Sequence, residues 1–242
     1  MSGRDRVYRE EHGQIVDFVF DDSVADVFPD MIRRSVPGYE TVIPITGMLA
    51  ARHLGQMAGA RRLAYDLGCS LGATTAAVLS QLDERPARVI AVDNAPAMIA
   101  RAGEAIHDPR VRFEVADVTE LEFEPAGVVL LNFVLQFIDP QERVPLLQKV
   151  RKALAPDGLL IVSEKLRFED RDTQARFEQA HLDYKRANGY SELEISQKRS
   201  ALEKVMIVDT EAEHRGRFEA AGFATVDKWF QCLNWASYLV AP

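Results

Sequence analysis

Cysteine and histidine are scarce in this sequence of 242 residues, and their scarcity excludes several kinds of site. The two cysteines, Cys69 and Cys232, form neither a CxxC motif nor a disulfide framework, which is typical of a reducing compartment. The five histidines never pair at the spacing that metal ligands need. We therefore expect a cytoplasmic protein that holds no metal ion.

Long apolar runs and an excess of positive charge are also lacking. No apolar run approaches the roughly 18 residues of a membrane-spanning helix. The opening MSGRDRVYREEHG is polar and has no apolar signal-peptide core. With 29 Lys+Arg against 37 Asp+Glu, the formal net charge is −8, which opposes broad electrostatic binding to nucleic acid but is compatible with a local basic patch. We expect neither a membrane nor a nucleic acid as a direct partner.

The composition is that of a globular protein, with 47% hydrophobic and 27% charged residues. The length suits one domain with an elaboration. We expect a single domain over 1–242 in four parts: an N-terminal helical segment (1–60), an α/β core (61–167), a helical insertion (168–207), and a closing helix with a β-hairpin (208–242). In the first part, Pro29, Pro37-Gly38 and Pro44 should each end or bend a helix.

The core alternates β and α patterns. Strands are predicted over 61–68, 87–94, 111–118, 127–138 and 158–166, with helical patterns between them. Strands joined by helical crossovers form a parallel sheet covered by helices on both faces. The C-terminal stretch predicts two strands around a turn near Asn234, as an antiparallel edge. The sequence therefore predicts an α/β, Rossmann-like fold with a mostly parallel seven-stranded sheet and an antiparallel edge strand.

The first functional signal is the run Tyr65-Asp66-Leu67-Gly68-Cys69-Ser70-Leu71-Gly72, which joins a predicted strand to a predicted helix. Glycines let the backbone approach a ligand closely, and a helix N-terminus favours a carboxylate or phosphate. The Gly-x-x-x-Gly spacing differs from the G-x-G-x-x-G of dinucleotide sites, so an NAD oxidoreductase is the weaker interpretation. A tight turn without a ligand is the structural alternative.

Polar residues end the strands that follow. Asp93 can accept both ribose hydroxyls of a nucleoside, or Asp93 or Asn94 can cap the helix that begins near Pro96. Asp117 can accept an exocyclic adenine amine, or it is a loop acid. Asn132, inside an apolar run, needs a partner if it is buried, either a neighbouring backbone group or a ligand. Because ligands of open parallel sheets lie outside the carboxyl ends of the strands, the sequence predicts one crevice for all these residues.

The helical insertion contains a clear helix start. Ser191 with Glu194 three residues later forms a capping box, and Tyr190 and Ile195 are placed as a hydrophobic staple. A helix is predicted over about 192–206, and one face of it holds Ile195, Lys198, Arg199, Leu202, Val205 and Met206. Arg199 is therefore expected to pack inward, with Lys198 at the edge of this face. Periodicity alone leaves open an internal pair with Glu203 or a side chain that reaches solvent.

These motifs resemble those of a known family. The segments DLGCSLG and AVDNAP look like the Gly-rich and ribose-binding motifs of class I S-adenosylmethionine (SAM) dependent methyltransferases, with Ser70 where a middle glycine is common. The chain is similar to the carboxy-S-adenosylmethionine (carboxy-SAM) synthases over nearly all of residues 15–240, on the segments FPDMIRRSVPGYE, YDLGCSLGATT, DNAPAMI, LNFVLQF and KRANGYSELEISQKRSALEKVM. The last segment is the most specific, because it lies outside the generic fold.

The resemblance implies the class I methyltransferase fold as a single SAM-binding domain, with N-terminal helices and a helical insertion. It implies a transferase that converts SAM and prephenate into carboxy-SAM and phenylpyruvate, as a cytoplasmic homodimer without a metal. The product would serve a separate enzyme that completes the 5-oxyacetyl modification of a tRNA wobble uridine. Two other functions stay open: an ordinary SAM-dependent methyltransferase acting on a small molecule or tRNA, and a SAM-binding regulatory or scaffold dimer.

The resemblance also implies roles for the residues that match the family motifs. Gly68, Cys69 and Ser70 would hold the methionine end of SAM, Asp93 and Asn94 the ribose, and Asp117 and Val118 the adenine. Asn132 would line the crevice, and Tyr39 would close over the ligand, although Tyr39 by itself fits a core aromatic better. Arg199 would bind the new carboxylate. The cations that face the two carboxylates of prephenate are sought among Arg33, Lys165, Lys185, Arg186 and Lys198.

Electrostatics supports the presence of an anion beside Arg199. SAM is a sulfonium cation, and two like charges about 4 Å apart repel by roughly 4 kcal/mol at an effective dielectric constant of about 20. An arginine beside the methyl group is therefore stable only where a carboxylate lies between the two charges. Carboxylation of the methyl group supplies that carboxylate, and a guanidinium can bind it with two parallel hydrogen bonds.

Overall fold

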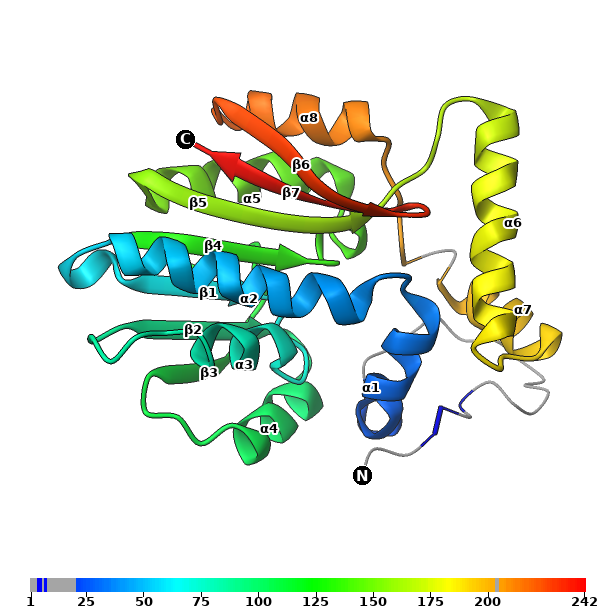
Figure 1. Cartoon of the computed structure of the whole chain (residues 1–242), viewed down its shortest axis with the longest axis horizontal. Coiled ribbons are helices and arrows are strands. Elements are labelled where there is room, and N and C mark those ends of the chain that lie inside the picture. Colours follow the sequence, from blue (N-terminus) through cyan, green and yellow to red (C-terminus); the bar gives the residue numbers. More distant parts are fainter. Residues whose placement is uncertain (1–3, 6, 8–20, 203–204) are drawn as a thin grey trace.

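A seven-stranded sheet forms the centre of the protein in the computed structural model, which describes residues 4–5, 7, 21–202 and 205–242 (Figure 1). The strand order is β3-β2-β1-β4-β5-β7-β6. Strands β1 to β5 pair in parallel, whereas β7 is antiparallel to both β5 and β6. The strands are β1 (Leu63–Leu67), β2 (Arg88–Asp93), β3 (Val111–Val115), β4 (Ala126–Asn132), β5 (Leu154–Lys165), β6 (Thr225–Cys232) and β7 (Trp235–Ala241). The predicted fold class is confirmed.

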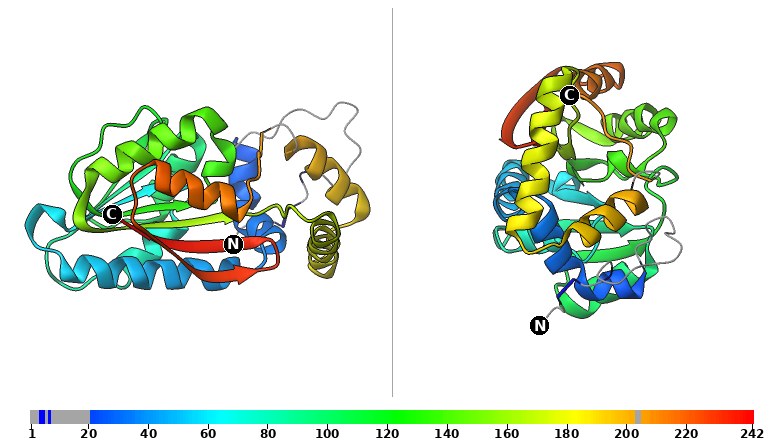
Figure 2. Two further views of the ribbon diagram at one scale, coloured as in Figure 1. Left: turned by 90° about the horizontal axis from the view of Figure 1, so that it is seen from above. Right: turned by 90° about the vertical axis from the view of Figure 1, so that its right-hand side faces the viewer.

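Helices cover both faces of the sheet. The helices are α1 (Asp22–Ser35), α2 (Tyr39–Gln56), α3 (Ala73–Leu79), α4 (Pro96–Ala105), α5 (Pro140–Ala153), α6 (Arg171–Ala187), α7 (Glu192–Leu202) and α8 (Glu211–Ala220). Figure 2 shows α2 on one side of the sheet and α5 with α8 on the other. Within the described ranges, no helix combines the length and the apolar character that crossing a membrane requires.

Alternating side chains of β1, an interior strand, contribute to the hydrophobic cores on the two faces of the sheet. Leu63, Tyr65 and Leu67 of β1 join the cluster that includes the buried side chains of α5 and α8. Ala64, on the opposite face, joins the cluster of α2 and α3. This arrangement follows from the period of two in a β-strand and explains why the central strands are apolar on both faces.

Two of the three proline sites of the N-terminal segment, which were predicted to end or bend a helix, do not end one. Only the Pro37-Gly38 turn separates two helices, where Gly38 takes a left-handed conformation before α2. Pro29 lies inside α1 and Pro44 lies inside α2. A proline inside a helix removes one backbone hydrogen bond. In α2 the packing of buried side chains and of Gly47 against Ala77 outweighs that loss, because this helix lies on the sheet.

The strand predicted over 127–138 is too long. Strand β4 ends at Asn132, and Phe133 turns out of it with φ of 64°. The buried carboxylate of Glu164 then accepts the backbone N–H groups of Val134, at 2.9 Å, and Leu135, at 2.8 Å. Because apolar residues continue on both sides of Asn132, the pattern is the same for a longer strand and for this turn, and the carboxylate of Glu164 on the neighbouring strand β5 decides between them.

The helical insertion forms α6 and α7, which lie beyond the carboxyl ends of the strands, close to α1 (Figure 1). The predicted capping box is present: the Ser191 hydroxyl accepts the N–H of Glu194 at 3.3 Å, and the Glu194 carboxylate accepts the N–H of Ser191 at 2.7 Å. The described part of this helix runs over Glu192–Leu202, and residues 203–204, which follow it, lie outside the described residues. Glu203, which was considered as an internal partner of Arg199, lies outside the described residues.

Candidate functional site

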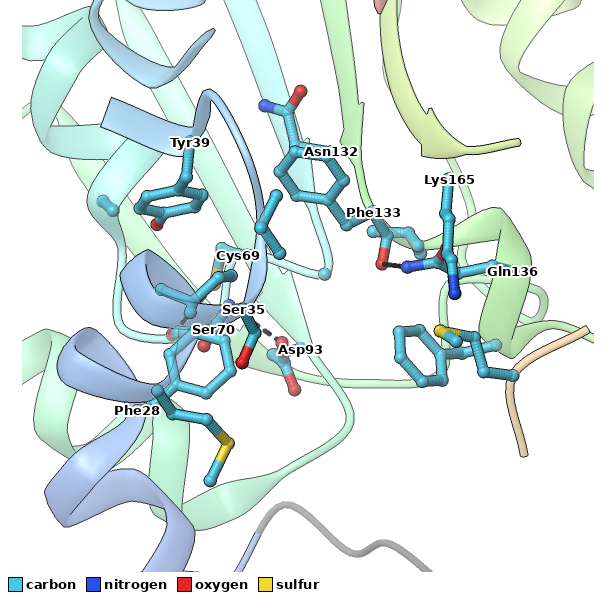
Figure 3. A pocket seen from close by; sticks show the side chains of 18 of the residues that line it. Phe28, Ser35, Tyr39, Cys69, Ser70, Asp93, Asn132, Phe133, Gln136 and Lys165 are labelled. Carbon is cyan, nitrogen blue, oxygen red and sulfur yellow. Dashed lines mark hydrogen bonds between the residues drawn. The ribbon is translucent and has the colours of Figure 1, made fainter. Parts of the chain in front are cut away.

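A cavity of about 650 Å³ opens at the carboxyl ends of the parallel strands, between the sheet, α1, the start of α2, α6 and α7 (Figure 3). This volume falls within the roughly 300–1,000 Å³ that is typical of small-molecule sites. Nine of the ten predicted site residues line it, namely Tyr39, Gly68, Cys69, Ser70, Asp93, Asn94, Asp117, Val118 and Asn132. The tenth residue, Arg199, is not part of its lining.

The Gly-rich turn is held in a left-handed conformation beside the cavity. Gly68 has φ of 68°, and a Cβ atom built on it would lie 2.5 Å from Cγ2 of Val134. Ser70 has φ of 51°, which is uncommon for a residue with a side chain. Its N–H donates to the Asp93 carboxylate at 2.8 Å. The turn therefore depends on one glycine for space and on one carboxylate for its conformation.

Replacing Gly68 with alanine should destabilise the protein by about 1–3 kcal/mol, because the new methyl group meets Val134 and the φ angle is strained. We also expect SAM binding to weaken at least about tenfold. The matched control is Gly103→Ala in α4, where a Cβ has open space. That variant should gain about 0.5–1 kcal/mol from reduced chain entropy. Urea unfolding and calorimetric titration with SAM measure both effects, and a Gly68→Ala variant as stable as the wild type would contradict this account.

The carboxylate of Asp93 uses both of its oxygens. Oδ2 accepts the N–H of Ser70, and Oδ1 accepts the N–H of Ala95 at 2.9 Å. Burial raises the pKa of this carboxyl, while the two backbone donors favour its charged form. The predicted alternative, a side-chain cap on the next helix, is wrong, because the N-cap residue of α4 is Ala95, whose own side chain cannot accept the N–H groups of the first turn. A carboxylate has further acceptor capacity, so Asp93 can also bind a hydroxyl in the cavity.

Asp66 lies behind the Gly-rich turn and outside the lining of the cavity. It is fully buried and accepts a hydrogen bond from the hydroxyl of Thr75 in α3 at 2.6 Å. Burial raises the pKa of Asp66 to about 7. Its contact with Thr75 fixes the start of α3 against β1, so this residue supports the turn and has no contact with the cavity.

Asp117 and Val118 follow β3 at the rim of the same cavity. One oxygen of Asp117, Oδ1, accepts both the N–H of Thr119, at 2.8 Å, and its hydroxyl, at 2.7 Å. Asp117 thus closes a turn, as a loop acid does, and also lines the cavity. Val118 is buried beside it.

Asn132 presents an unsatisfied acceptor. Its amide nitrogen donates to the hydroxyl of Thr74 at 3.2 Å, whereas its buried Oδ1 has no hydrogen-bond partner among the described residues. Two further lining residues have a buried polar atom without a partner among the described residues: the acceptor Oε1 of Gln136 and the donor Nε1 of Trp235. A buried polar atom without a partner costs roughly 1–3 kcal/mol. Three such atoms therefore belong to residues that line the cavity, where a polar ligand can supply the missing partners.

Aromatic side chains form the wall between the two ends of the cavity. The ring of Phe133 lies 6.2 Å from that of Tyr39 and 5.3 Å from that of Trp235, and His181 lies 6.0 Å from Trp235. Burial raises the pKa of Tyr39 to about 12. Sequence reasoning missed Phe133, Gln136 and Trp235. Gln136 is polar inside the predicted strand 127–138, as Asn132 is, and that signal could have found it, whereas no signal distinguished Phe133 or Trp235.

Several cations line the cavity. Figure 3 shows Lys165 and Gln136 at one end and Cys69, Ser70 and Asp93 at the other. Five cations were considered for prephenate, and three of them, Lys165, Lys185 and Lys198, line the cavity. Arg33 also lines it, but its side chain is 59% exposed and pairs with Glu40 at 3.5 Å. Arg186 pairs with Asp183 and Glu192 outside the lining.

Lys198, and not Arg199, is the inward-facing cation of α7. Lys198 is 5% exposed, and its ammonium donates to the hydroxyl of Ser35 at 2.9 Å and lies 3.6 Å from the Asp5 carboxylate. The side chain of Arg199 is 58% exposed and lies 3.7 Å from Glu178. The prediction that Arg199 packs inward is therefore wrong for this structure. Neighbouring helix positions differ by about 100°, and the polar partners around Lys198 determine which of the two turns inward.

The chain is similar to known methyltransferase-fold proteins in sequence. A family profile described as "Methyltransferase domain" matches residues 64–158. The protein named "Carboxy-S-adenosyl-L-methionine synthase" from Pseudomonas paraeruginosa (strain DSM 24068 / PA7) is 48% identical over 250 residues, which cover 100% of this chain and 98% of that protein.

Two solved structures share the fold at low identity. A protein of the O-methyltransferase family from Burkholderia thailandensis is 19% identical with a TM-score of 0.66, and covers 92% of this chain. Human N-acetylserotonin methyltransferase, in complex with SAM, is 16% identical with a TM-score of 0.61, and covers 91% of this chain. The chain spans 60% and 55% of the lengths of these two proteins, respectively. They support the class I methyltransferase fold and nothing finer.

Proposed function

The chain belongs to the carboxy-S-adenosyl-L-methionine synthase family, and from this membership we propose that it converts SAM and prephenate into carboxy-SAM and phenylpyruvate. It is a transferase of the SAM-dependent methyltransferase fold, with SAM as a substrate. One observation carries the choice of co-substrate: the cavity that holds the Gly-rich turn and Asp93 is also lined by Lys165, Lys185 and Lys198, and Lys165 lies at the opposite end from Ser70 and Asp93 (Figure 3). The end with Ser70 and Asp93 suits a nucleoside, and the opposite end suits an anion.

In the proposed reaction, prephenate aromatises with loss of CO2 and of its ring hydroxide. The hydroxide removes a proton from the SAM methyl group, and the carbon of the resulting sulfonium ylide forms a bond to CO2. The balance is carboxy-SAM, phenylpyruvate and water. The contribution of the chain is placement of the two substrates and exclusion of water, which suits a cavity walled by Tyr39, Phe133 and Trp235.

The proposed contacts with SAM follow the matched motifs. Gly68, Cys69 and Ser70 bind the methionine end, Asp93 and Asn94 the ribose, and Asp117 and Val118 the adenine, while Asn132 and Tyr39 enclose the ligand. Arg199 is proposed to bind the carboxylate of the product. It lies close enough to Lys165 and Lys185 for its charge to lower the pKa of both. A bound carboxylate would relieve this repulsion.

The wider setting is also part of the proposal. We propose that the protein acts in the cytoplasm as a homodimer, without direct contact with a membrane or nucleic acid, as its net charge of −8 suggests. Its product supplies a separate enzyme that modifies the tRNA wobble uridine.

Mass spectrometry of the small molecule released by denaturing the purified protein tests this function. A mass of SAM plus one CO2 is expected, together with formation of carboxy-SAM when SAM and prephenate are supplied. Retention of SAM or its demethylated product alone, with methyl transfer to an acceptor in the absence of prephenate, would overturn the synthase and support an ordinary methyltransferase. A bound ligand that is never turned over would instead indicate a regulatory SAM-binding protein.

A further inference from the structure

Three lysines from three separate elements line the cavity. Lys165 is the last residue of β5, Lys185 lies in the last turn of α6, and Lys198 lies in α7. All three line the same cavity. Burial lowers the pKa of each, to about 7 for Lys185 and about 8 for Lys198. A folded chain does not gather desolvated ammonium groups without a compensating anion, because burying an unpaired charge is costly.

The anions within the chain satisfy these cations unequally. Lys198 has Asp5 at 3.6 Å and Tyr190 as a hydrogen-bond acceptor at 3.3 Å. Lys165 has the charge of Glu178 nearby. In the described part of the chain, the ammonium group of Lys185 forms neither an ion pair nor a hydrogen bond, and the charges that act on its pKa come from Lys165, Lys198 and Arg199. Lys185 is therefore the cation with the greatest unmet demand for an external carboxylate.

The surroundings of Lys165 suit an aromatic ring, because Lys165 of β5 pairs with Trp235 of β7. Phe133 and Trp235 form an edge-to-face pair with ring centres 5.3 Å apart, and His181 packs edge-on against Trp235. Buried Nε1 of Trp235 and Oε1 of Gln136 have no partner among the described residues. A ligand with an apolar ring, a carboxylate and a further polar oxygen would satisfy this combination.

We propose that Lys185, supported by Lys165, binds the carboxylate of the α-keto acid side chain, which prephenate retains when it becomes phenylpyruvate, and that the ring lies against Phe133 and Trp235. The assignment to prephenate rests on the proposed function. The carboxylate that leaves as CO2 is then directed away from the lysines and toward SAM.

This assignment of the two carboxylates follows from their fates. An ion pair stabilises a carboxylate more than the neutral CO2 it becomes, so a lysine on the leaving group would stabilise the ground state and slow the reaction. The side-chain carboxylate keeps its charge throughout, so a lysine on it supplies binding energy without raising the barrier. The product phenylpyruvate keeps this carboxylate and its ring, and must therefore bind at the same lysine.

Calorimetric titration with phenylpyruvate in the presence of SAM tests the assignment without requiring turnover. Lys185→Met should weaken phenylpyruvate binding at least about tenfold, whereas Lys185→Arg should keep it within about threefold because the charge remains. The control Lys152→Met removes an exposed lysine of α5 and should leave binding unchanged. SAM affinity should stay within about twofold in all variants.

The number of protons taken up on phenylpyruvate binding is a second measurement, and it distinguishes a loss of the Lys185 charge from a change in the shape of the site. A bound carboxylate raises the pKa of Lys185 from about 7, so binding at pH 8 should take up protons and weaken as the pH rises. The other groups facing this site are Lys165 of β5, His181 and Glu178 of α6, and Lys198 and Arg199 of α7. Lys185→Arg keeps the charge and should lose most of the proton uptake. The uptake is measured by comparing binding enthalpies in buffers of different ionisation enthalpy.

The outcomes separate this inference from the proposed function. Equal phenylpyruvate affinity in wild type and Lys185→Met, or no binding by wild type at millimolar concentration, would overturn the role of Lys185 even if carboxy-SAM is formed. Binding that depends on Lys185, in a protein that forms no carboxy-SAM from prephenate, would support an aromatic keto acid site and overturn the proposed reaction.

Discussion

Replacing Arg199 with alanine should leave SAM binding within about twofold of wild type and weaken carboxy-SAM binding at least about 30-fold. The difference follows from the charge of the two molecules: only carboxy-SAM carries a carboxylate at the former methyl group. Loss of a charge-assisted, bidentate ion pair costs about 2–5 kcal/mol. Titration of both ligands into both proteins measures the effect, and formation of carboxy-SAM from prephenate should fall in parallel.

The insertion offers a matched control and a competing residue. Arg186→Ala removes an arginine that pairs with Asp183 and Glu192 outside the cavity, and should change neither affinity. Lys198→Met removes the cation of α7 that faces inward. If carboxy-SAM affinity falls in Lys198→Met and is unchanged in Arg199→Ala, the proposed role of Arg199 is wrong and Lys198 takes its place.

The contrast between Arg199 and Lys198 shows the limit of helical periodicity. The capping box at Ser191 is a local signal, and the predicted helix start is confirmed. The orientation of the helix is not local, since the Lys198 ammonium contacts Ser35 and Asp5 from distant parts of the chain as well as the nearby Tyr190. Two adjacent cations carry no pattern that distinguishes them, so only tertiary contacts decide which is buried.

The same division between local and distant causes runs through the fold. The five parallel strands and the hairpin near Asn234 were predictable because each is a short β-branched or apolar run bounded by a turn signal. The end of β4 was not, because it depends on Glu164 from the neighbouring strand. Pro29 and Pro44 lie inside helices for a similar reason: burial of the helix outweighs a local loss.

Most of the cavity at the strand ends was predictable because topology brings those ends together. Gly68, Asp93, Asp117 and Asn132 follow successive strands, and the structure places them in one lining. The opposite wall was not predictable in this way. Trp235 reaches the cavity from the antiparallel hairpin, and Lys165, Lys185 and Lys198 converge from elements whose packing has no sequence period.

Asp93→Asn should weaken SAM binding by about 100-fold. Both oxygens of Asp93 accept backbone N–H groups, from Ser70 and from Ala95. An asparagine offers one acceptor and one NH2 group, so one of these N–H groups must face a donor. The left-handed turn at Ser70 then loses its restraint, and the ribose loses a charged acceptor. Hydrogen bonds to charged groups contribute about 1.5–3 kcal/mol each, so a hundredfold loss corresponds to about one such bond.

Asp117→Asn is the comparison that separates geometry from charge. Asp117 uses only Oδ1 to hold the N–H and hydroxyl of Thr119, so an asparagine preserves its turn. Both substitutions remove one negative charge beside the same cavity, and a purely electrostatic effect on the SAM cation would make their losses similar. If the carboxylate of Asp93 acts by holding the Gly-rich turn, calorimetry should show a loss at least about tenfold larger for Asp93→Asn. Equal losses would mean that charge, and not the conformation of the turn, determines affinity for SAM.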